Sequence, residues 1–197
     1  MIARLLLLIL ISCAMPALAQ LPKLEVMVKR ADSGKDIGFE VTASGAVNAT
    51  PATVWKILTD YERMSDYVPD LETAKVVSRT GNRVIVEQFG TARFLFFQRP
   101  IHLLVQVREE PISVIEVSLV NGDMKTYVCR WEFSPLPDQG GTRISYSGKL
   151  VPKFYVPGML GTKMVRSDIE RMMQAVLERL DQPEDAKPLK VRDDQAG

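Results

Sequence analysis

The chain has 197 residues, of which 46% are hydrophobic and 25% are charged, and this suits one folded domain with a hydrophobic core. Its 25 Lys and Arg nearly balance its 24 Asp and Glu, so no electrostatic argument favours binding to nucleic acid or to an anionic membrane. One His and two Cys cannot supply the usual zinc site. The chain also carries no glycine-rich phosphate loop and no nucleophile motif, so we expect no metal, no cofactor and no recognisable catalytic group.

The first residues are typical of an export signal. A positive charge precedes the apolar run 5–11, and Ala17-Leu18-Ala19 supplies the small residues of a cleavage site before Gln20. We therefore predict a secretory signal peptide over residues 1–19, with cleavage between Ala19 and Gln20, and a periplasmic or secreted protein. Two alternatives stay open, namely a bacterial lipobox that would place a lipid on Cys13 and an uncleaved anchor.

The mature chain is predicted to be one domain over residues 20–182. Removal of the signal peptide leaves Cys129 as its one cysteine, so we expect no internal disulfide. Cys129 lies within a strand pattern, and we interpret it as a buried, inert thiol.

The elements begin with a hairpin and a short helix. Alternating residues over 24–28 and 37–47 predict the hairpin. Thr50 and Pro51 are favourable at the start of a helix that runs to residue 60. A second short helix or turn is predicted over 60–67 and ends before Pro69. The acidic residues around these short helices are interpreted as caps and solvated charges; they are Asp60, Glu62, Asp66 and Asp70.

A long series of strands follows. We predict strands over 73–78, 84–97, 101–108, 113–120, 124–133 and 142–151. Gly90 is expected to bend the second of these, and Arg99-Pro100 to separate it from the third. Asn121-Gly122 predicts a tight two-residue hairpin, because both central residues of that turn need positive φ.

The last predicted element is an amphipathic helix over 158–180, rich in methionine. Its polar side is expected to include Arg166, Glu170, Arg171, Glu178 and Arg179. Residues 183–197 are charged and free of aromatics, and we predict that they are disordered. One antiparallel sheet with so few helices to cover it must curl around the last helix, which leaves an apolar space between the two. This α+β arrangement favours binding of an apolar ligand.

Several segments resemble one superfamily in their pattern and order. They are Asn48-Ala49-Thr50-Pro51-Ala52-Thr53-Val54-Trp55, Leu58-Thr59-Asp60-Tyr61, Tyr67-Val68-Pro69, Trp131-Glu132-Phe133-Ser134-Pro135-Leu136, Gly141-Thr142-Arg143-Ile144 and Val156-Pro157-Gly158. Over about Val41–Leu180 the chain resembles the START-like (SRPBCC) superfamily, in its coenzyme Q-binding and polyketide cyclase/dehydrase branch. The resemblance implies a helix-grip fold, in which a curved antiparallel sheet wraps a long C-terminal helix and two short helices lie near the N-terminus. Lipid-transfer proteins, quinone binders, aromatase/cyclases and hormone receptors share that fold, so the fold alone does not choose among them.

The candidate ligand-binding residues are the aromatic residues of the strands and the apolar residues of the last helix. They are Trp55, Phe89, Phe94, Phe96, Tyr127, Trp131, Tyr146, Phe154, Met164, Ile169, Met172 and Met173. Arg93 and Arg99 flank the expected bend and are the polar candidates for the cavity mouth. Arg130 alternates with Trp131, so it points outward if Trp131 points inward. His102 is interpreted as a surface residue of a strand.

These patterns favour a periplasmic binding or transfer protein for a small hydrophobic molecule, such as a lipid, an isoprenoid quinone or a polyketide-like aromatic. A transfer role would allow transient contact with a membrane. Two alternatives stay open: a cyclase- or dehydratase-type enzyme that uses the same cavity, and a protein-interaction module without a ligand.

Overall fold

The structure is a computed structural model that describes residues 23–182 apart from 33, 95–96, 138–139 and 157. The predicted signal peptide, with its cleavage site between Ala19 and Gln20 and the alternative lipid site at Cys13, lies outside the described residues. The predicted tail over 183–197 and the candidate Phe96 lie outside them as well.

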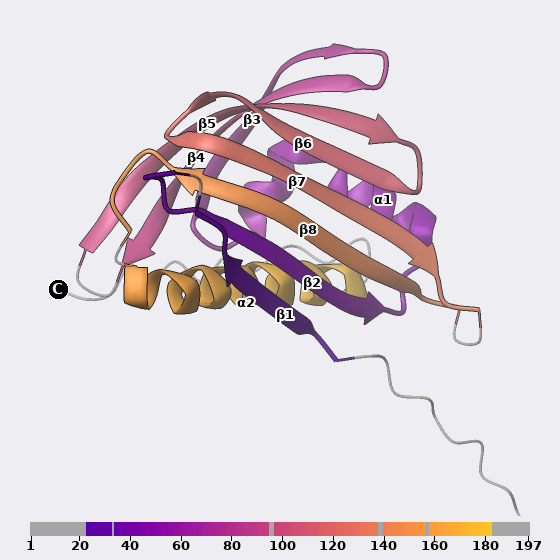
Figure 1. The fold of residues 1–197 in the computed structure, drawn as a ribbon. Helices are drawn as coiled ribbons and strands as arrows, with labels where there is room; N and C mark the ends of the chain where they lie inside the picture. The colour runs from indigo at the N-terminus through magenta and orange to yellow at the C-terminus, as the bar shows by residue number, and fades with distance from the viewer. Residues whose placement is uncertain (1–22, 33, 95–96, 138–139, 157, 183–197) are drawn as a thin grey trace, which may run out of the picture.

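The described residues form one eight-stranded antiparallel sheet and three helical segments (Figure 1). In chain order the elements are β1 (Glu25–Arg30), β2 (Phe39–Val47), α1 (Pro51–Leu58), the 3-10 helix η1 (Tyr61–Asp66), β3 (Leu71–Thr80), β4 (Arg83–Phe94), β5 (Phe97–Glu110), β6 (Val114–Gly122), β7 (Met124–Pro135), β8 (Thr142–Pro152) and α2 (Gly158–Asp181). The strands lie in the order β1-β2-β8-β7-β6-β5-β4-β3. The curved sheet covers α2, which lies next to β1 and β2 (Figure 1). The predicted helix-grip fold is therefore confirmed.

The first helix starts as its sequence predicts. Thr50 accepts a hydrogen bond on its side-chain oxygen from the backbone N–H of Thr53 at 3.3 Å, and Pro51 occupies the first helical position. Both features satisfy or remove backbone donors that a helix start would otherwise leave unpaired.

Strand alternation places the core on the concave face of the sheet. Val84 and Val86 on β4 pair with Val107 and Val105 on β5, and all four are buried. The same alternation continues across β6, β7, β8 and β2, where Ile115, Cys129, Phe133, Ile144, Tyr146 and Val41 are buried. The helix α2 completes this core on the other side with four buried residues, Ile169, Met173, Val176 and Leu180.

The expected strand break at Arg99-Pro100 is wrong. Phe94 pairs with Phe97, so the chain reverses there, and Pro100 lies within β5 opposite Thr91. The pairing of β5 with β6 begins only at Leu103. Pro100 is therefore in a stretch of β5 that has a strand on one side only, where its missing N–H is tolerated.

At Gly90, where we expect a bend, the sheet has a bulge, and its extra residue lies on the neighbouring strand β3. Leu71 pairs with Gly90 and Thr73 with Phe89, which leaves Glu72 as the extra residue of β3. Gly90 has a different role, because a Cβ there would lie 2.4 Å from the carbonyl oxygen of Asp70. That carbonyl accepts a hydrogen bond from the N–H of Thr91 at 2.8 Å.

The predicted tight turn at Asn121-Gly122 is also wrong. Both residues extend β6 and pair with Leu104 and Leu103 of β5, and the backbone of Gly122 has φ 135. The pairing of β6 with β7 covers only Val114–Ser118, opposite 128–132. Beyond that point the two strands separate, and we call this line the seam of the sheet.

Asp123 closes the open end of the seam. Its N–H donates to the carbonyl of His102 at 2.9 Å, and its carboxylate accepts from the His102 N–H at 2.8 Å. Its own carbonyl accepts from the N–H of Lys153 at 3.0 Å. One residue therefore connects β5 with the chain that follows β8.

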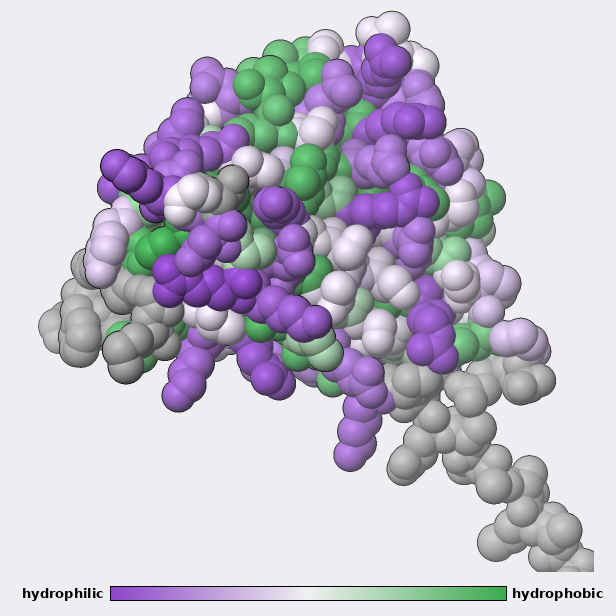
Figure 2. All heavy atoms as spheres, in the orientation of Figure 1, coloured by the Kyte–Doolittle hydropathy of each residue, from purple (hydrophilic) through white to green (hydrophobic). Residues whose placement is uncertain are grey.

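The surface in Figure 2 is largely hydrophilic, with hydrophobic side chains dispersed among charged ones. Within the residues that the structure describes, no helix is long and apolar enough to cross a bilayer.

Candidate functional site

A cavity of about 310 Å³ lies between the concave face of the sheet, η1 and α2. This volume lies at the lower end of the range of small-molecule sites. Its apolar lining residues include Leu58, Met64, Val68, Leu71, Val86, Ile101, Leu103, Val105, Val107, Ile115, Val117, Ile169, Met172 and Val176. The cavity is therefore suited to a ligand that is apolar over most of its surface.

A small polar group lies on the β7–β8 wall of the cavity. The Cys129 thiol donates to the Tyr127 hydroxyl at a distance of 4.0 Å, and the Trp131 ring meets the Tyr146 ring edge-on with centroids 4.8 Å apart. All four residues line the cavity, because alternation turns 127, 129 and 131 of β7 to one side. The predicted candidates Tyr127, Trp131 and Tyr146 are thus brought together.

These groups remain protonated at neutral pH. Burial raises the pKa of the Cys129 thiol to about 11. The neighbouring Cys129 and burial raise the pKa of Tyr127, and burial, followed by the effect of Cys129, raises that of Tyr146. A thiol acts as a nucleophile as its thiolate, so Cys129 is poorly suited to that role. The two hydroxyls are suited to donating hydrogen bonds to a polar atom of a ligand.

A buried carboxylate, Glu109, binds Tyr61 at the start of η1 and the exposed Arg79. Tyr61, which lines the cavity, donates its hydroxyl to Glu109 at 2.7 Å, and Arg79 donates to both oxygens of Glu109 at 2.8 and 3.0 Å. Sequence reasoning missed this group. Glu109 alternates in phase with Val105 and Val107, so its inward direction could have been read from the strand pattern.

Charged residues gather where Val68–Leu71, Gly90–Ala92 and the middle of α2 meet, and we call this side the mouth of the cavity. Asp70 pairs with Arg93 and, at 2.9 Å, with Arg171, which also pairs with Asp168 at 2.7 Å. These four residues form the mouth cluster. Burial raises the pKa of Asp168, although the hydrogen bond from Arg171 opposes that effect.

The mouth cluster changes the interpretation of Asp70. The sequence placed it among solvated acidic residues, but its side chain is 16% exposed and joins β4 to α2 through two arginines. Its backbone has φ 62, a left-handed conformation that is uncommon outside glycine and is tolerated best by Asn and Asp. Arg93, a predicted residue of the mouth, lies in this cluster.

Two further candidates from the last helix line the cavity, and two lie elsewhere on that helix. Ile169 and Met172 are lining residues. Met173 is fully buried and packs in the main core, whereas Met164 is half-buried and lies outside the lining.

The remaining candidates lie around the cavity or away from it. Phe89 borders the rim, but its ring stacks on His102 with centroids 4.5 Å apart, and the residue is 43% exposed. Trp55 of α1 packs edge-on against Phe133 of β7, with the ring centroids 6.4 Å apart. The guanidinium of Arg99 lies 4.9 Å from the Phe154 ring centre, outside the lining. Phe94 ends β4.

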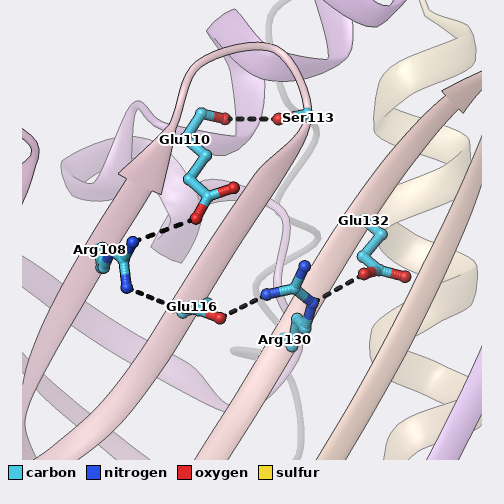
Figure 3. A network of polar contacts seen from close by, with 6 residues as sticks. All are labelled: Arg108, Glu110, Ser113, Glu116, Arg130 and Glu132. Atoms are coloured by element: carbon cyan, nitrogen blue, oxygen red, sulfur yellow. Dashed lines mark hydrogen bonds and ion pairs between the residues drawn. The ribbon is translucent and has the colours of Figure 1, made fainter.

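Arg130 points outward, as its alternation with Trp131 predicts. Figure 3 shows it between Glu116 and Glu132, and Arg108 reaches Glu116 and Glu110. This network crosses the outer face of β5, β6 and β7. Exposed pairs of this kind contribute little to stability, and they face away from the cavity. Among the described residues, no group of three potential ligands could hold a metal ion.

The fold is shared with several solved proteins. A STAR-related lipid transfer protein from Xanthomonas axonopodis aligns with a TM-score of 0.65 at 16% identity, over 83% of this chain and 98% of that one. A START superfamily protein from Mycobacterium smegmatis aligns with a TM-score of 0.62 at 19% identity, over 73% of this chain and 97% of that one. The Zhui aromatase/cyclase from Streptomyces sp. R1128 aligns with a TM-score of 0.61 at 15% identity, over 73% of this chain and 94% of that one. At these identities the likeness concerns the fold alone.

Comparison with curated proteins found no match. A family model described as polyketide cyclase / dehydrase and lipid transport matches residues 47–177. This match covers α1, η1, strands β3 to β8 and most of α2, which includes every element that lines the cavity. The chain therefore belongs to the polyketide cyclase/dehydrase and lipid transport family, and it shares the fold of START superfamily and STAR-related lipid transfer proteins.

Proposed function

We propose that this protein is an exported binding or transfer protein that holds a small hydrophobic ligand between the sheet and α2. The observation that carries the proposal is the cavity of about 310 Å³ with its largely apolar lining. Burial of apolar ligand surface supplies roughly 25 cal/mol per Å², and the hydroxyls of Tyr127 and Tyr146 would orient one polar atom of the ligand. The export signal of the sequence supports a site of action outside the cytoplasm.

Blocking the cavity tests this proposal. Val117 lines the cavity on β6, whereas Val128 on the adjacent strand β7 is 42% exposed on the outer face. We expect Val117→Phe to fill the site and abolish binding of the neutral probe N-phenylnaphthylamine. The matched control Val128→Phe should bind as the wild type does. Binding is measured by probe fluorescence and by the change in tryptophan emission, to which Trp131 in the cavity wall and Trp55 contribute.

The same material is suited to native mass spectrometry of protein purified from its own source. A copurified hydrophobic molecule that is absent from Val117→Phe would support the proposal and provide the ligand for identification. If the wild type neither binds the probe nor carries such a molecule, the proposal is wrong. If Val117→Phe binds as well as Val128→Phe, the ligand lies elsewhere.

Export is tested separately through the mature N-terminus. We expect intact mass and N-terminal sequencing to show a chain that begins at Gln20 in the periplasmic or secreted fraction. A lipid mass on Cys13 would identify an anchored lipoprotein instead, and an uncut chain in the cytoplasm would contradict export.

An enzyme of cyclase or dehydratase type is the second candidate. The observation in its favour is the pair of buried phenols beside Trp131 in the cavity wall, since neutral hydroxyls in an apolar site can polarise a ligand carbonyl. This role predicts that Tyr127→Phe or Tyr146→Phe removes turnover of a polyketide-like substrate while probe binding remains. Equal turnover in both variants and the wild type would exclude it.

A further inference from the structure

The cavity-lining face of α2 ends in an arginine. Met172 and Val176 line the cavity, and Arg179 follows Val176 by three residues, so helical spacing places it on the same face. The sequence placed Arg179 on the polar side of the helix, but only 6% of the residue is exposed. An arginine keeps its charge at all ordinary pH values, so this cation is buried.

The guanidinium of Arg179 has an unsatisfied donor within the part of the chain that the structure describes. Among the residues that the structure describes, its Nη1 has no hydrogen-bond acceptor, and the same is true of the buried Tyr67 hydroxyl as a donor. The Arg179 charge acts on Tyr67 and opposes the rise in its pKa that burial causes. A buried unpaired guanidinium is costly, so two unused donors in one place indicate a site for an acceptor that carries negative charge.

Both side chains line a second hollow of about 700 Å³, which is polar and adjoins the mouth. The carboxylates that line it have other partners: Asp70 has Arg93 and Arg171, Asp66 has Arg63, Glu72 has Thr91, and Glu178 has Gln174. Arg179 is thus the lining cation that these pairings leave over.

The hollow and the apolar cavity share part of their walls. Val68, Pro69, Asp70, Leu71 and Thr91 line both spaces. The two spaces therefore adjoin along Val68–Leu71 and Thr91, and a ligand that occupies both would pass at this wall.

We propose that the ligand is an amphiphile with one anionic end, a carboxylate or a phosphate, which binds Arg179 and Tyr67 while its apolar chain fills the cavity. This inference rests on the proposed function and adds the chemical class of the ligand. The anion would accept hydrogen bonds from the guanidinium and the phenol. Asp70 at the shared wall already pairs with Arg93 and Arg171. Arg179 would therefore be the cation that binds the headgroup.

The test compares two probes that differ only at the polar end, decanoate and decanol, by calorimetric titration. We expect the wild type to bind decanoate about tenfold or more tightly than decanol, as a charge-assisted hydrogen bond provides. Arg179→Met should lose this preference while its decanol affinity stays within about threefold of the wild type. The matched control is Arg166→Met, an exposed arginine of the same helix that pairs with Glu170.

Arg179→Met keeps a long side chain and removes a buried charge, so we expect it to fold, which a thermal melt will verify. Should it fail to fold, Tyr67→Phe provides the test, with a smaller loss of decanoate affinity and no loss for decanol. Inorganic phosphate is the third probe and separates a headgroup site from a free-anion site.

The outcomes separate this inference from the proposed function. If the wild type binds both probes equally and Arg179→Met changes neither affinity, the anionic ligand is wrong and the apolar cavity stands. If phosphate alone raises the melting temperature of the wild type but not of Arg179→Met, and decanoate is not preferred, the site takes a free anion and the amphiphile is wrong. If the wild type binds neither decanoate nor decanol, the proposed function itself fails.

Discussion

Gly90 gives the sharpest test of how the mouth of the cavity is held. In Gly90→Ala the new Cβ would lie 2.4 Å from the carbonyl oxygen of Asp70, a distance that backbone atoms cannot tolerate, so the loop before β3 must move. The movement breaks the 2.8 Å hydrogen bond from Thr91 to Asp70, which contributes about 1 kcal/mol. It also weakens the pairs of Asp70 with Arg93 and Arg171, which are charge-assisted and partly buried and contribute about 1–2 kcal/mol more.

We therefore expect Gly90→Ala to lower the free energy of unfolding by about 2–3 kcal/mol. The matched control is Gly81→Ala in the turn between β3 and β4, where φ is +57 and nothing lies within 4 Å of the added Cβ. That change strains the backbone by about 1 kcal/mol without touching the mouth. Urea unfolding followed by circular dichroism measures both variants.

The two variants should also differ in ligand exchange. Stopped-flow dissociation of N-phenylnaphthylamine should be faster in Gly90→Ala, because the mouth cluster that joins β4 to α2 is loosened, and unchanged in Gly81→Ala. The reasoning is refuted if the two variants lose the same stability and release the probe at the wild-type rate.

Three further predictions concern the interior. Arg79→Met should lower the free energy of unfolding by about 1–3 kcal/mol, because Glu109 is 8% exposed and keeps only the Tyr61 hydrogen bond; an unchanged urea midpoint would contradict the importance of this pair. Met173→Ala should lower the free energy of unfolding by about 2–5 kcal/mol, since the side chain is fully buried. Met164→Ala, at a half-buried position, should lower it by less than about 1 kcal/mol in the same assay. Burial raises the pKa of Cys129 in the folded protein to about 11, above the ordinary 9.0 of a thiol. The unfolded chain therefore loses this proton at a lower pH, so the contribution of the neutral thiol to the free energy of unfolding is complete below pH 9 and is lost as the pH rises to 11. Urea titrations over that range should show the wild type losing about 2–3 kcal/mol more than Cys129→Ala, and parallel losses would show that this thiol is not held in its neutral form.

The order of elements could be predicted from the sequence because it depends on local signals. Apolar alternation marks the strands, and the Thr50-Pro51 start and the apolar stripe of residues 165–180 mark the helices. The hairpin turns were harder to place. Asn121-Gly122 has the composition of a tight turn, but pairing with β5 competes for the same residues and determines the result. Which partner wins is a tertiary property that a local pattern does not contain.

The candidate site could be predicted only in part, for the same reason. Tyr127, Trp131 and Tyr146 follow from strand parity, and they line the cavity. The mouth cluster brings together residues from η1–β3, β4 and α2, and those distances come from the fold. Arg179 was placed on the polar face by its residue type, although its spacing from Met172 and Val176 puts it on the buried one.

The seam between β6 and β7 has a mechanical consequence. Only five residue pairs, from Val114–Glu132 to Ser118–Val128, join β1-β2-β8-β7 to β6-β5-β4-β3. The seam thus divides the eight strands into two plates that meet along a short ladder, and the hydrogen bonds of Asp123 to His102 join them at its far end. One plate rests on α2 through β1 and β2, and the other provides most of the cavity wall. The size of the cavity therefore depends on the angle at which the two plates meet along this short ladder, as well as on the side chains that line it.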